Sequence, residues 1–407
     1  MRLIFISVIG FAVILNLAFI PQHKHRHRAQ NSNKSAVLAE LPAGYNDLFA
    51  GAGECEMCHN SMTNAQGESV SIINDWRSSM MANSAKDPLW RAKVSHETLV
   101  NPDLAGVIEN KCTKCHAPLG HFNAHHNGMD YSIAEMENDP LALDGVSCTM
   151  CHQIKPESLG NYSGNILVGE NKVIWGPFEN PFTNSMVQHT GYTPTHSNHI
   201  KDSKLCGSCH TLLTPTVDLE GNLTGTEFVE QAIYHEWLNS DFSQNNTSCQ
   251  SCHVPEIDDP VQIGSMPPWI EPRSPFGMHH LAGANVFMLK ILKNNIETLG
   301  LTADPIHFDS TIARAERLLQ TASVFMEVNE VERTTDTLFV DVILQNMAGH
   351  KFPTGFPSRR AFIELEVTDQ SGTTLFHSGA MDDDFQLLSD DESFQPHHNV
   401  IHQNEQV

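Results

Sequence analysis

The pattern of apolar and polar residues divides the chain into three parts. Residues 3–20 form a nearly continuous apolar run that follows Arg2. From residue 35 to 325, apolar positions recur at helical spacing in only a few segments, and long polar stretches separate them. After residue 325 apolar and polar residues alternate, which is typical of strands. We therefore expect three regions with the bounds 1–34, 35–325 and 326–407.

A few segments in the middle region show a helical period. They are residues 71–85, 227–240, 283–300 and 308–325. In the last of them, Asp309 or Ser310 is the expected N-cap residue.

The C-terminal region reads as a small β-sandwich-like module. Residues 337–344 and 361–379 alternate, with Ile363, Leu365 and Val367 on one face and a "DQSG" turn behind them. Only three or four strands are recognisable before the polar end of the chain. We therefore expect either a piece of a longer protein or a disordered tail.

The N-terminal run has the character of an export signal. Its length approaches the roughly 20 apolar residues that cross a bilayer, so an uncleaved membrane anchor and a cleaved signal are both open. The basic stretch at 22–28 conflicts with the positive-inside expectation for an anchor whose body lies outside.

Composition is that of a globular acidic protein. The chain has 407 residues, 40% of them hydrophobic, and a net charge of −24. An acidic protein surface repels nucleic acid and anionic lipid, whereas it attracts a basic protein partner. A solvated acidic surface that keeps an exported protein soluble explains most of these charges equally well.

All ten cysteines fall in five copies of one motif, Cys-x-x-Cys-His. The pairs are Cys55 and Cys58, Cys112 and Cys115, Cys148 and Cys151, Cys206 and Cys209, and Cys249 and Cys252. This motif attaches haem c, because the two thiols add to the vinyl groups of the macrocycle and the adjacent imidazole binds the iron.

Other uses of the cysteines fit less well. Zinc sites would pair two Cys-x-x-Cys units and leave one over, and a disulfide framework would use looser spacings in a shorter chain. Five covalent haem c groups are therefore the expected cofactors. Haem c is attached outside the cytoplasm, which agrees with an export signal and predicts a periplasmic or otherwise exported protein, free or tethered to the inner membrane.

Close spacing of the motifs predicts the fold. The chain between successive motifs is too short to build an ordinary core around each haem. We expect a mostly α-helical region with long loops wrapped around stacked haems, followed by the small β-sandwich-like C-terminal module.

Each motif supplies one axial iron ligand. These proximal ligands are His59, His116, His152, His210 and His253. A second His or Met on the iron makes an electron carrier, whereas an open position allows a substrate to bind. The preferred distal candidates are His96, His199, His235, His279 and His350, and the reserves are His121, His125, His126, His189, His196 and His280. Met80 and Met81 could supply a thioether, although core packing is the simpler role for them.

Several stretches resemble one known family. They are "WRSSMMANSAKDP", "CTKCHAPLG", "GVSCTMCHQI", "LCGSCHTLLTP", "YHEWLNS", "CQSCHVP" and "HHLAGAN". Over roughly residues 50–300 the chain is similar to the multihaem cytochromes related to cytochrome c-554. The resemblance implies helical wrapping, stacked and perpendicular haem pairs, mainly His/His ligation and electron transfer. Some relatives keep one five-coordinate haem, and some are reductases. The fifth motif and the "GHKFPTGFPSRRAF" stretch depart from the c-554 pattern.

The main hypothesis is an exported pentahaem cytochrome that carries electrons between redox partners. Its rival is a multihaem oxidoreductase in which one open iron acts on a small nitrogen or sulfur compound. The C-terminal module could serve either one as an interaction domain. No stretch of the sequence marks a catalytic site, so enzymatic activity is left open.

Overall fold

The computed structural model describes residues 39–357, 359–383 and 386–388. The apolar run at 3–20 and its basic flank, on which the export and anchor predictions depend, lie outside these residues. Among the described residues, no helix combines the length and apolar character that crossing a membrane requires.

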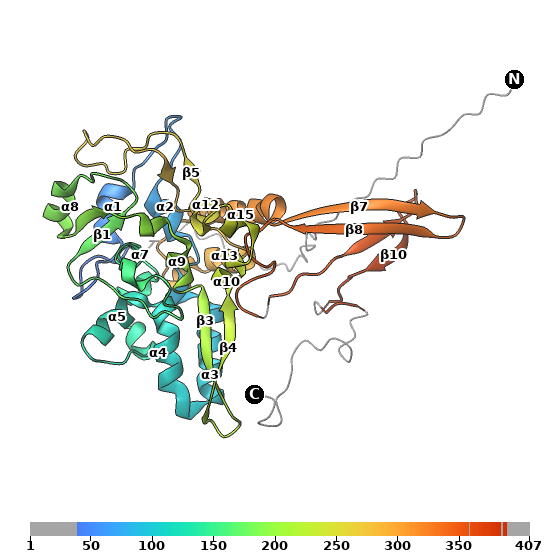
Figure 1. Cartoon of the computed structure of the whole chain (residues 1–407), viewed down its shortest axis with the longest axis horizontal. Coiled ribbons are helices and arrows are strands. Elements are labelled where there is room, and N and C mark those ends of the chain that lie inside the picture. Colours follow the sequence, from blue (N-terminus) through green and yellow to red (C-terminus); the bar gives the residue numbers. More distant parts are fainter. Residues whose placement is uncertain (1–38, 358, 384–385, 389–407) are drawn as a thin grey trace, which may run out of the picture. The chain divides into compact units, whose positions relative to one another are not determined.

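Short helices dominate residues 39–320 (Figure 1). The α-helices are α1 (Gly53–His59), α2 (Ile72–Arg77), α3 (Pro88–Val100), α4 (Ala105–His116), α5 (Pro118–His126), α6 (Ile133–Met136), α7 (Cys148–His152), α8 (Thr183–Thr190), α9 (Ser203–Gly207), α10 (Ile233–Leu238), α11 (Asp241–Gln244), α12 (Cys249–His253), α13 (Val286–Asn294), α14 (Ile296–Leu299) and α15 (Pro305–Leu318). Single turns of 3₁₀ helix are η1 (Ser84–Lys86), η2 (Pro102–Leu104), η3 (Ala142–Asp144), η4 (Pro156–Ser158) and η5 (Asn198–Lys201), and a π-helical turn, η6 (Leu319–Ser323), follows α15.

Strands occur only as two-stranded sheets in the described part of the chain. The strands are β1 (Val173–Gly176), β2 (Thr193–His196), β3 (Thr211–Val217), β4 (Leu223–Ala232), β5 (Glu256–Ile257), β6 (Phe276–Gly277), β7 (Val324–Arg333), β8 (Leu338–Asn346), β9 (Leu365–Thr368) and β10 (Thr374–Ser378). β1 pairs with β2 in parallel, and the other four pairs are antiparallel hairpins.

The described residues divide into two compact units. The larger one ends at Arg359 and contains β7 and β8, and the smaller one begins at Arg360 and contains β9 and β10. Small antiparallel sheets at the C-terminal end are thus confirmed. Their arrangement as a sandwich and the domain boundary after residue 325 stay predictions.

Two element predictions are wrong in detail. Residues 227–232, expected to start the helix at 227–240, belong instead to β4, because they pair with β3 from Thr211↔Ala232 onward. Within 227–240, residues 233–238 form α10. The last long helix begins earlier than expected, since Asp304 caps it and Pro305 occupies its first position.

Apolar side chains form several small clusters instead of one continuous core. α13 and α15 pack through Leu292, Phe308 and Ala315. Another cluster joins Ile73 and Trp76 of α2 to residues preceding α1, and Cys55 and Cys148 border it. Motif cysteines therefore lie at the edges of the apolar clusters, as expected if bound cofactors complete the core.

Candidate functional site: five Cys-x-x-Cys-His motifs

Each Cys-x-x-Cys-His motif lies on a helical turn. The first, third and fifth motifs end α1, α7 and α12, and the second ends α4. Although α9 ends at Gly207, the turn continues through the fourth motif, since the His210 N–H donates to the Cys206 carbonyl at 2.9 Å. Helical spacing places positions i, i+3 and i+4 on one face, so both thiols and the imidazole of a motif share one side.

A backbone carbonyl orients the imidazole in four of the motifs. The Nδ1 contacts are His59 to Ile263 O (2.6 Å), His116 to Ser84 O (3.3 Å), His152 to Trp175 O (2.7 Å) and His253 to Ala282 O (2.7 Å). A carbonyl only accepts hydrogen bonds, so Nδ1 carries the proton and Nε2 keeps a free electron pair in the neutral ring. This arrangement is typical of histidines that bind a metal through Nε2.

Desolvation keeps these imidazoles neutral. It lowers the pKa of His59, His152 and His253, and it lowers the pKa of His116 and His210 to about 4. For His210 the nearby His253, Arg359 and His350 lower the pKa further. Only the neutral ring can donate an electron pair to a metal, so all five histidines are ready to bind one at neutral pH.

The thiols suit covalent attachment of a cofactor. All ten cysteines are free of disulfides. Burial raises the pKa of Cys112 to about 12 and that of Cys151 to about 11, so these thiols are neutral at pH 7. Paired thiols with an adjacent Nε2 on one face are the donor set that haem c requires, and the residues therefore fit this group.

Thiols of different motifs lie against one another. The interacting pairs are Cys55 with Cys148, Cys115 with Cys209, and Cys206 with Cys249. Cys151 lies close enough to the fourth motif to raise the pKa of both its thiols. The first motif thus adjoins the third, the third adjoins the fourth, and the fourth also adjoins the second and the fifth.

His279 is the distal candidate with the clearest geometry. Its ring is nearly parallel to that of His152, with ring centroids 6.4 Å apart and planes inclined by 21°. Its Nδ1 contacts the Gly277 carbonyl at 3.1 Å, which leaves Nε2 free. Burial lowers the pKa of His279 to about 4, and nearby His152 and His59 lower it further.

His350 reaches the fourth and fifth motifs from the loop after β8. It lies near enough to His210 and His253 to lower the pKa of both. Its own Nδ1 contacts the Lys351 carbonyl at 2.9 Å. The loop is held by Glu236 of α10, which accepts hydrogen bonds from the Lys351 N–H and the Thr354 hydroxyl.

Three other distal candidates have different surroundings. His235 packs edge-on against Tyr162, with centroids 4.9 Å apart. His96 keeps 67% of its side chain exposed and lies 3.7 Å from a Glu97 oxygen. His199 is buried with Nδ1 2.6 Å from the Ser197 hydroxyl and Nε2 2.9 Å from the Ile154 carbonyl, so both of its ring nitrogens have partners.

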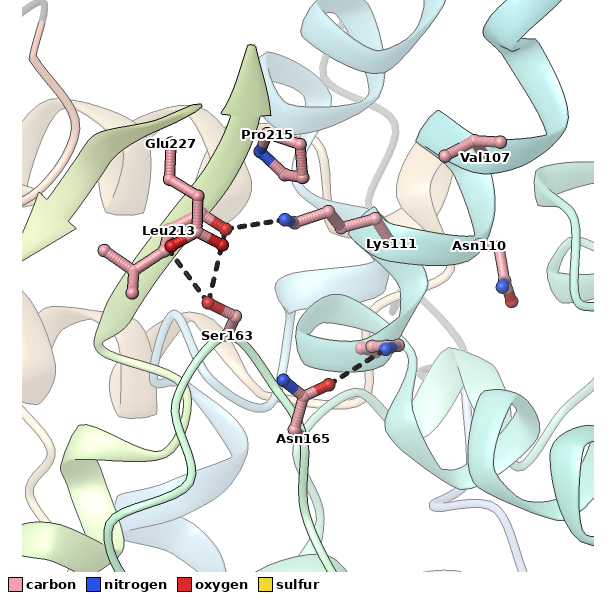
Figure 2. Close-up of a pocket in the computed structure, with 9 residues that line it drawn as sticks. Val107, Asn110, Lys111, Ser163, Asn165, Leu213, Pro215 and Glu227 are labelled. Atoms are coloured by element: carbon pink, nitrogen blue, oxygen red, sulfur yellow. Dashed lines mark hydrogen bonds between the residues drawn. The ribbon is translucent and has the colours of Figure 1, made fainter. Parts of the chain in front are cut away.

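A pocket of about 320 Å³ lies beside the second motif (Figure 2). Val107, Asn110, Lys111 and Lys114 line it from one face of α4, opposite the loop that carries Ser163 and Asn165. Lys111 Nζ donates to the Leu213 carbonyl at 2.7 Å, and Lys114 Nζ donates to Asn165 Oδ1 at 3.3 Å. Lys111 thus links α4 to β3, and Lys114 links α4 to the loop that carries Asn165.

Asp144 ties the first motif to the segment before the third, because its Oδ2 accepts from the Ala52 N–H at 2.8 Å. Burial raises the pKa of Asp144 from 3.8 to about 6. The native state therefore binds more protons than the unfolded state between these values, and stability falls as pH rises from about 4 to about 6, by roughly 3 kcal/mol. Asp144→Asn should flatten this slope. Denaturant unfolding of both proteins from pH 4 to 7 tests it, and identical slopes would contradict the assignment.

The sequence pointed to all five motifs but missed the groups that orient them. The acceptors of His59 and His152 lie 204 and 23 residues away, and they are backbone carbonyls that no residue type marks. Arg359 beside His210 and the Glu236 contacts depend on the loop fold in the same way. His121 ranked only as a reserve, yet it is 2% exposed with Nδ1 3.1 Å from the Thr113 hydroxyl. Its position five residues after His116, the histidine of the second motif, was the available signal.

The first three motifs lie in a region that matches a known family. Residues 54–153 match the family model described as cytochrome c554 and c-prime. Among solved structures, the penta-heme cytochrome c552 from Thermochromatium tepidum is similar at 17% sequence identity and a TM-score of 0.47, over 81% of this chain and 74% of that one. No curated protein matches the chain. The family match over residues 54–153 supports a multihaem c-type cytochrome related to cytochrome c554.

Proposed function

We propose that the protein is an exported cytochrome with five covalently bound haem c groups, and that it carries electrons between redox partner proteins. The contact between motifs carries this proposal. Thiols of the first and third, second and fourth, and fourth and fifth motifs interact, so cofactors attached there would be neighbours. When bound, haem c supplies one-electron redox chemistry that side chains cannot supply.

The chain's own residues have defined roles in this proposal. The ten cysteines attach the cofactors, and the five motif histidines bind the irons through Nε2. Backbone carbonyls such as Ile263 O and Trp175 O fix the tautomer of these rings and increase their basicity. Thr149 and Met150 are buried within the third motif, which keeps water away from it, and low local polarity is one of the means by which a protein sets a haem potential.

For the second axial ligands we propose His279 opposite His152, and His350 at the fourth or fifth motif. His235 and His96 remain candidates for the second motif and its neighbours. His199 is the weakest of the five, since both of its ring nitrogens have hydrogen-bond partners.

Attachment of haem c outside the cytoplasm supports a periplasmic or otherwise exported location, either free or anchored to the inner membrane by residues 3–20. The partners are an electron donor and an electron acceptor, of which at least one has a basic docking patch. With a net charge of −24, the chain is unsuited to nucleic acid.

A second candidate function rests on Arg359. Its guanidinium donates to Thr354 O (2.8 Å) and Asn285 Oδ1 (2.9 Å), and it lies near enough to His210 to lower the pKa of that ring. A cation beside an iron ligand is suited to holding an anion. If the fourth iron is open, the protein would be an oxidoreductase of a small nitrogen or sulfur compound.

One sample can separate these functions. Pyridine-haemochrome analysis should give five haems per chain, and low-temperature electron paramagnetic resonance of the oxidised protein should show only low-spin iron. Fewer than five haems would overturn the pentahaem proposal. A stoichiometric high-spin signal would replace the carrier with the oxidoreductase, and nitrite, hydroxylamine and tetrathionate would then be tested as substrates.

A further inference from the structure

Exposed apolar side chains gather at the first motif. Met57, between the two cysteines of that motif, is 57% exposed, Met266 is 41% exposed and Trp269 is 76% exposed. Single exposed apolar residues are ordinary on a protein surface, whereas a group of large ones at one place marks an interaction site. We call Met57, Met266 and Trp269 the first-motif face.

Hydrogen bonds place these residues together. The loop between β5 and β6 runs along α1, where the Ser265 N–H donates to the Cys58 carbonyl at 2.9 Å and the Ser265 hydroxyl donates to the Met57 carbonyl at 3.2 Å. Met266 follows directly. A turn from Pro267, whose carbonyl accepts from the Ile270 N–H at 3.2 Å, then presents Trp269 to solvent.

The same loop serves the chemistry of the motif. Its Ile263 carbonyl accepts from His59 Nδ1 at 2.6 Å. The loop that forms the exposed face therefore also holds the first iron ligand. Met57 itself lies between Cys55 and Cys58 in the chain.

Acidic residues predominate in the two segments that carry this face. Residues 39–76 and 254–272, the two segments to which the residues of the face belong, contain acidic residues but no lysine or arginine. The acidic residues are Glu40, Asp47, Glu54, Glu56, Glu68, Asp75, Glu256, Asp258, Asp259 and Glu271. Three of these acids pair with cations: Glu56 with Arg77 (3.2 Å), Glu256 with Lys201 (2.8 Å) and Asp75 with Arg314 (2.7 Å). Arg273 donates to the Glu179 and Asn180 carbonyls. Asp258, Asp259 and Glu271 lie on the loop that carries Met266 and Trp269.

We propose that the first-motif face is the docking surface for a redox protein with a basic face around an apolar centre. An aromatic and two thioether side chains inside an acidic rim have the composition of a transient interface, in which the apolar centre supplies affinity and the charged rim supplies steering. This inference rests on the proposed electron-transfer function and identifies where electrons cross to a partner.

Stopped-flow oxidation of the fully reduced holoprotein tests the proposal, with mitochondrial cytochrome c as the basic probe and duroquinone as an uncharged oxidant. The triple variant Asp258→Asn, Asp259→Asn, Glu271→Gln should lower the second-order rate with cytochrome c about 5- to 10-fold at low ionic strength, and the difference should vanish at high salt. Its matched control is Asp103→Asn, Asp130→Asn, Glu157→Gln, which changes the net charge equally on other exposed segments and should cost less than twofold.

Trp269→Ala should lower the cytochrome c rate several-fold at both salt concentrations, and Trp269→Phe should restore most of it. Equal rates for the two triple variants, or no effect of Trp269→Ala, would overturn the docking surface. The duroquinone rate should not change in any variant. A wild-type protein that reduces neither oxidant would instead overturn the electron-transfer function itself.

Discussion

Replacement of Cys148 and Cys151 by serine should remove the third haem and most of the folded protein with it. The third motif is enclosed, because Thr149 and Met150 between its cysteines are 1% and 2% exposed. Its neighbours also depend on it, since Cys148 lies against Cys55 and the Thr149 hydroxyl donates to the Ala50 carbonyl at 2.8 Å. We expect the yield of holoprotein to fall by at least about tenfold, measured by haem-stained gels and haemochrome content.

The fifth motif offers the matched control. α12 contains no buried residue, and Cys252 is the one exposed cysteine of the chain. Cys249→Ser with Cys252→Ser should therefore leave a folded protein whose intact mass is lower by one haem. A third-motif variant that accumulates with five haems would show that Cys148 and Cys151 attach none.

The contrast between these two motifs could not be read from the sequence. "CTMCH" and "CQSCH" predict the same haem attachment. This chemistry can be predicted from a short stretch of sequence, because two thiols and an imidazole fit on one helical turn. Burial of Met150 depends on Leu48, Phe49 and Leu119, which lie in other segments. Tertiary packing decides it, and no local pattern of apolar residues contains that information.

Secondary structure could likewise be predicted where neighbouring residues determine it. Apolar residues recur strongly in 283–300, and α13 and α14 lie there. The helix predicted from residue 227 is wrong up to residue 232, because the strand character of β4 depends on pairing with β3 and the side chains of β4 are largely exposed. The start of α15 was available from the sequence, since an Asp followed by Pro is a typical helix start.

The loop after β8 shows how a remote segment joins the site. Gly349 lies close to the rings of Trp237 and Phe242, so a side chain at this position would meet both at 3.4 Å. Glu236, 115 residues before Lys351 in the chain, then accepts the Lys351 N–H at 3.1 Å. These contacts bring His350 to His210 and His253. A histidine in a loop next to strands does not by itself indicate an iron ligand. Only the contacts of this loop with α10 place His350 near the motifs.

His279→Met should raise the potential of the third haem by about 0.1–0.3 V, a fraction of the roughly 0.8 V range that axial ligands cover. A thioether stabilises the reduced iron relative to a second imidazole, and His279 is the residue whose ring faces that of His152. Its Nδ1 contact with the Gly277 carbonyl leaves Nε2 available for the iron. A spectroelectrochemical titration would show one component moved upward and the others unchanged, and near-infrared magnetic circular dichroism would show one His/Met centre.

The adjacent His280 supplies the control for this substitution. Its Nε2 lies 3.7 Å from a buried Asp75 oxygen, and Arg314 holds the other oxygen of Asp75 at 2.7 Å. His280→Met changes the same atoms one position along the chain and should leave every centre with its original ligands, so no His/Met signal should arise. A His/Met signal from His280→Met, together with none from His279→Met, would transfer the axial role to His280. Since the two rings face opposite partners, His152 and Asp75, the pair of variants decides which imidazole completes the coordination of the third iron.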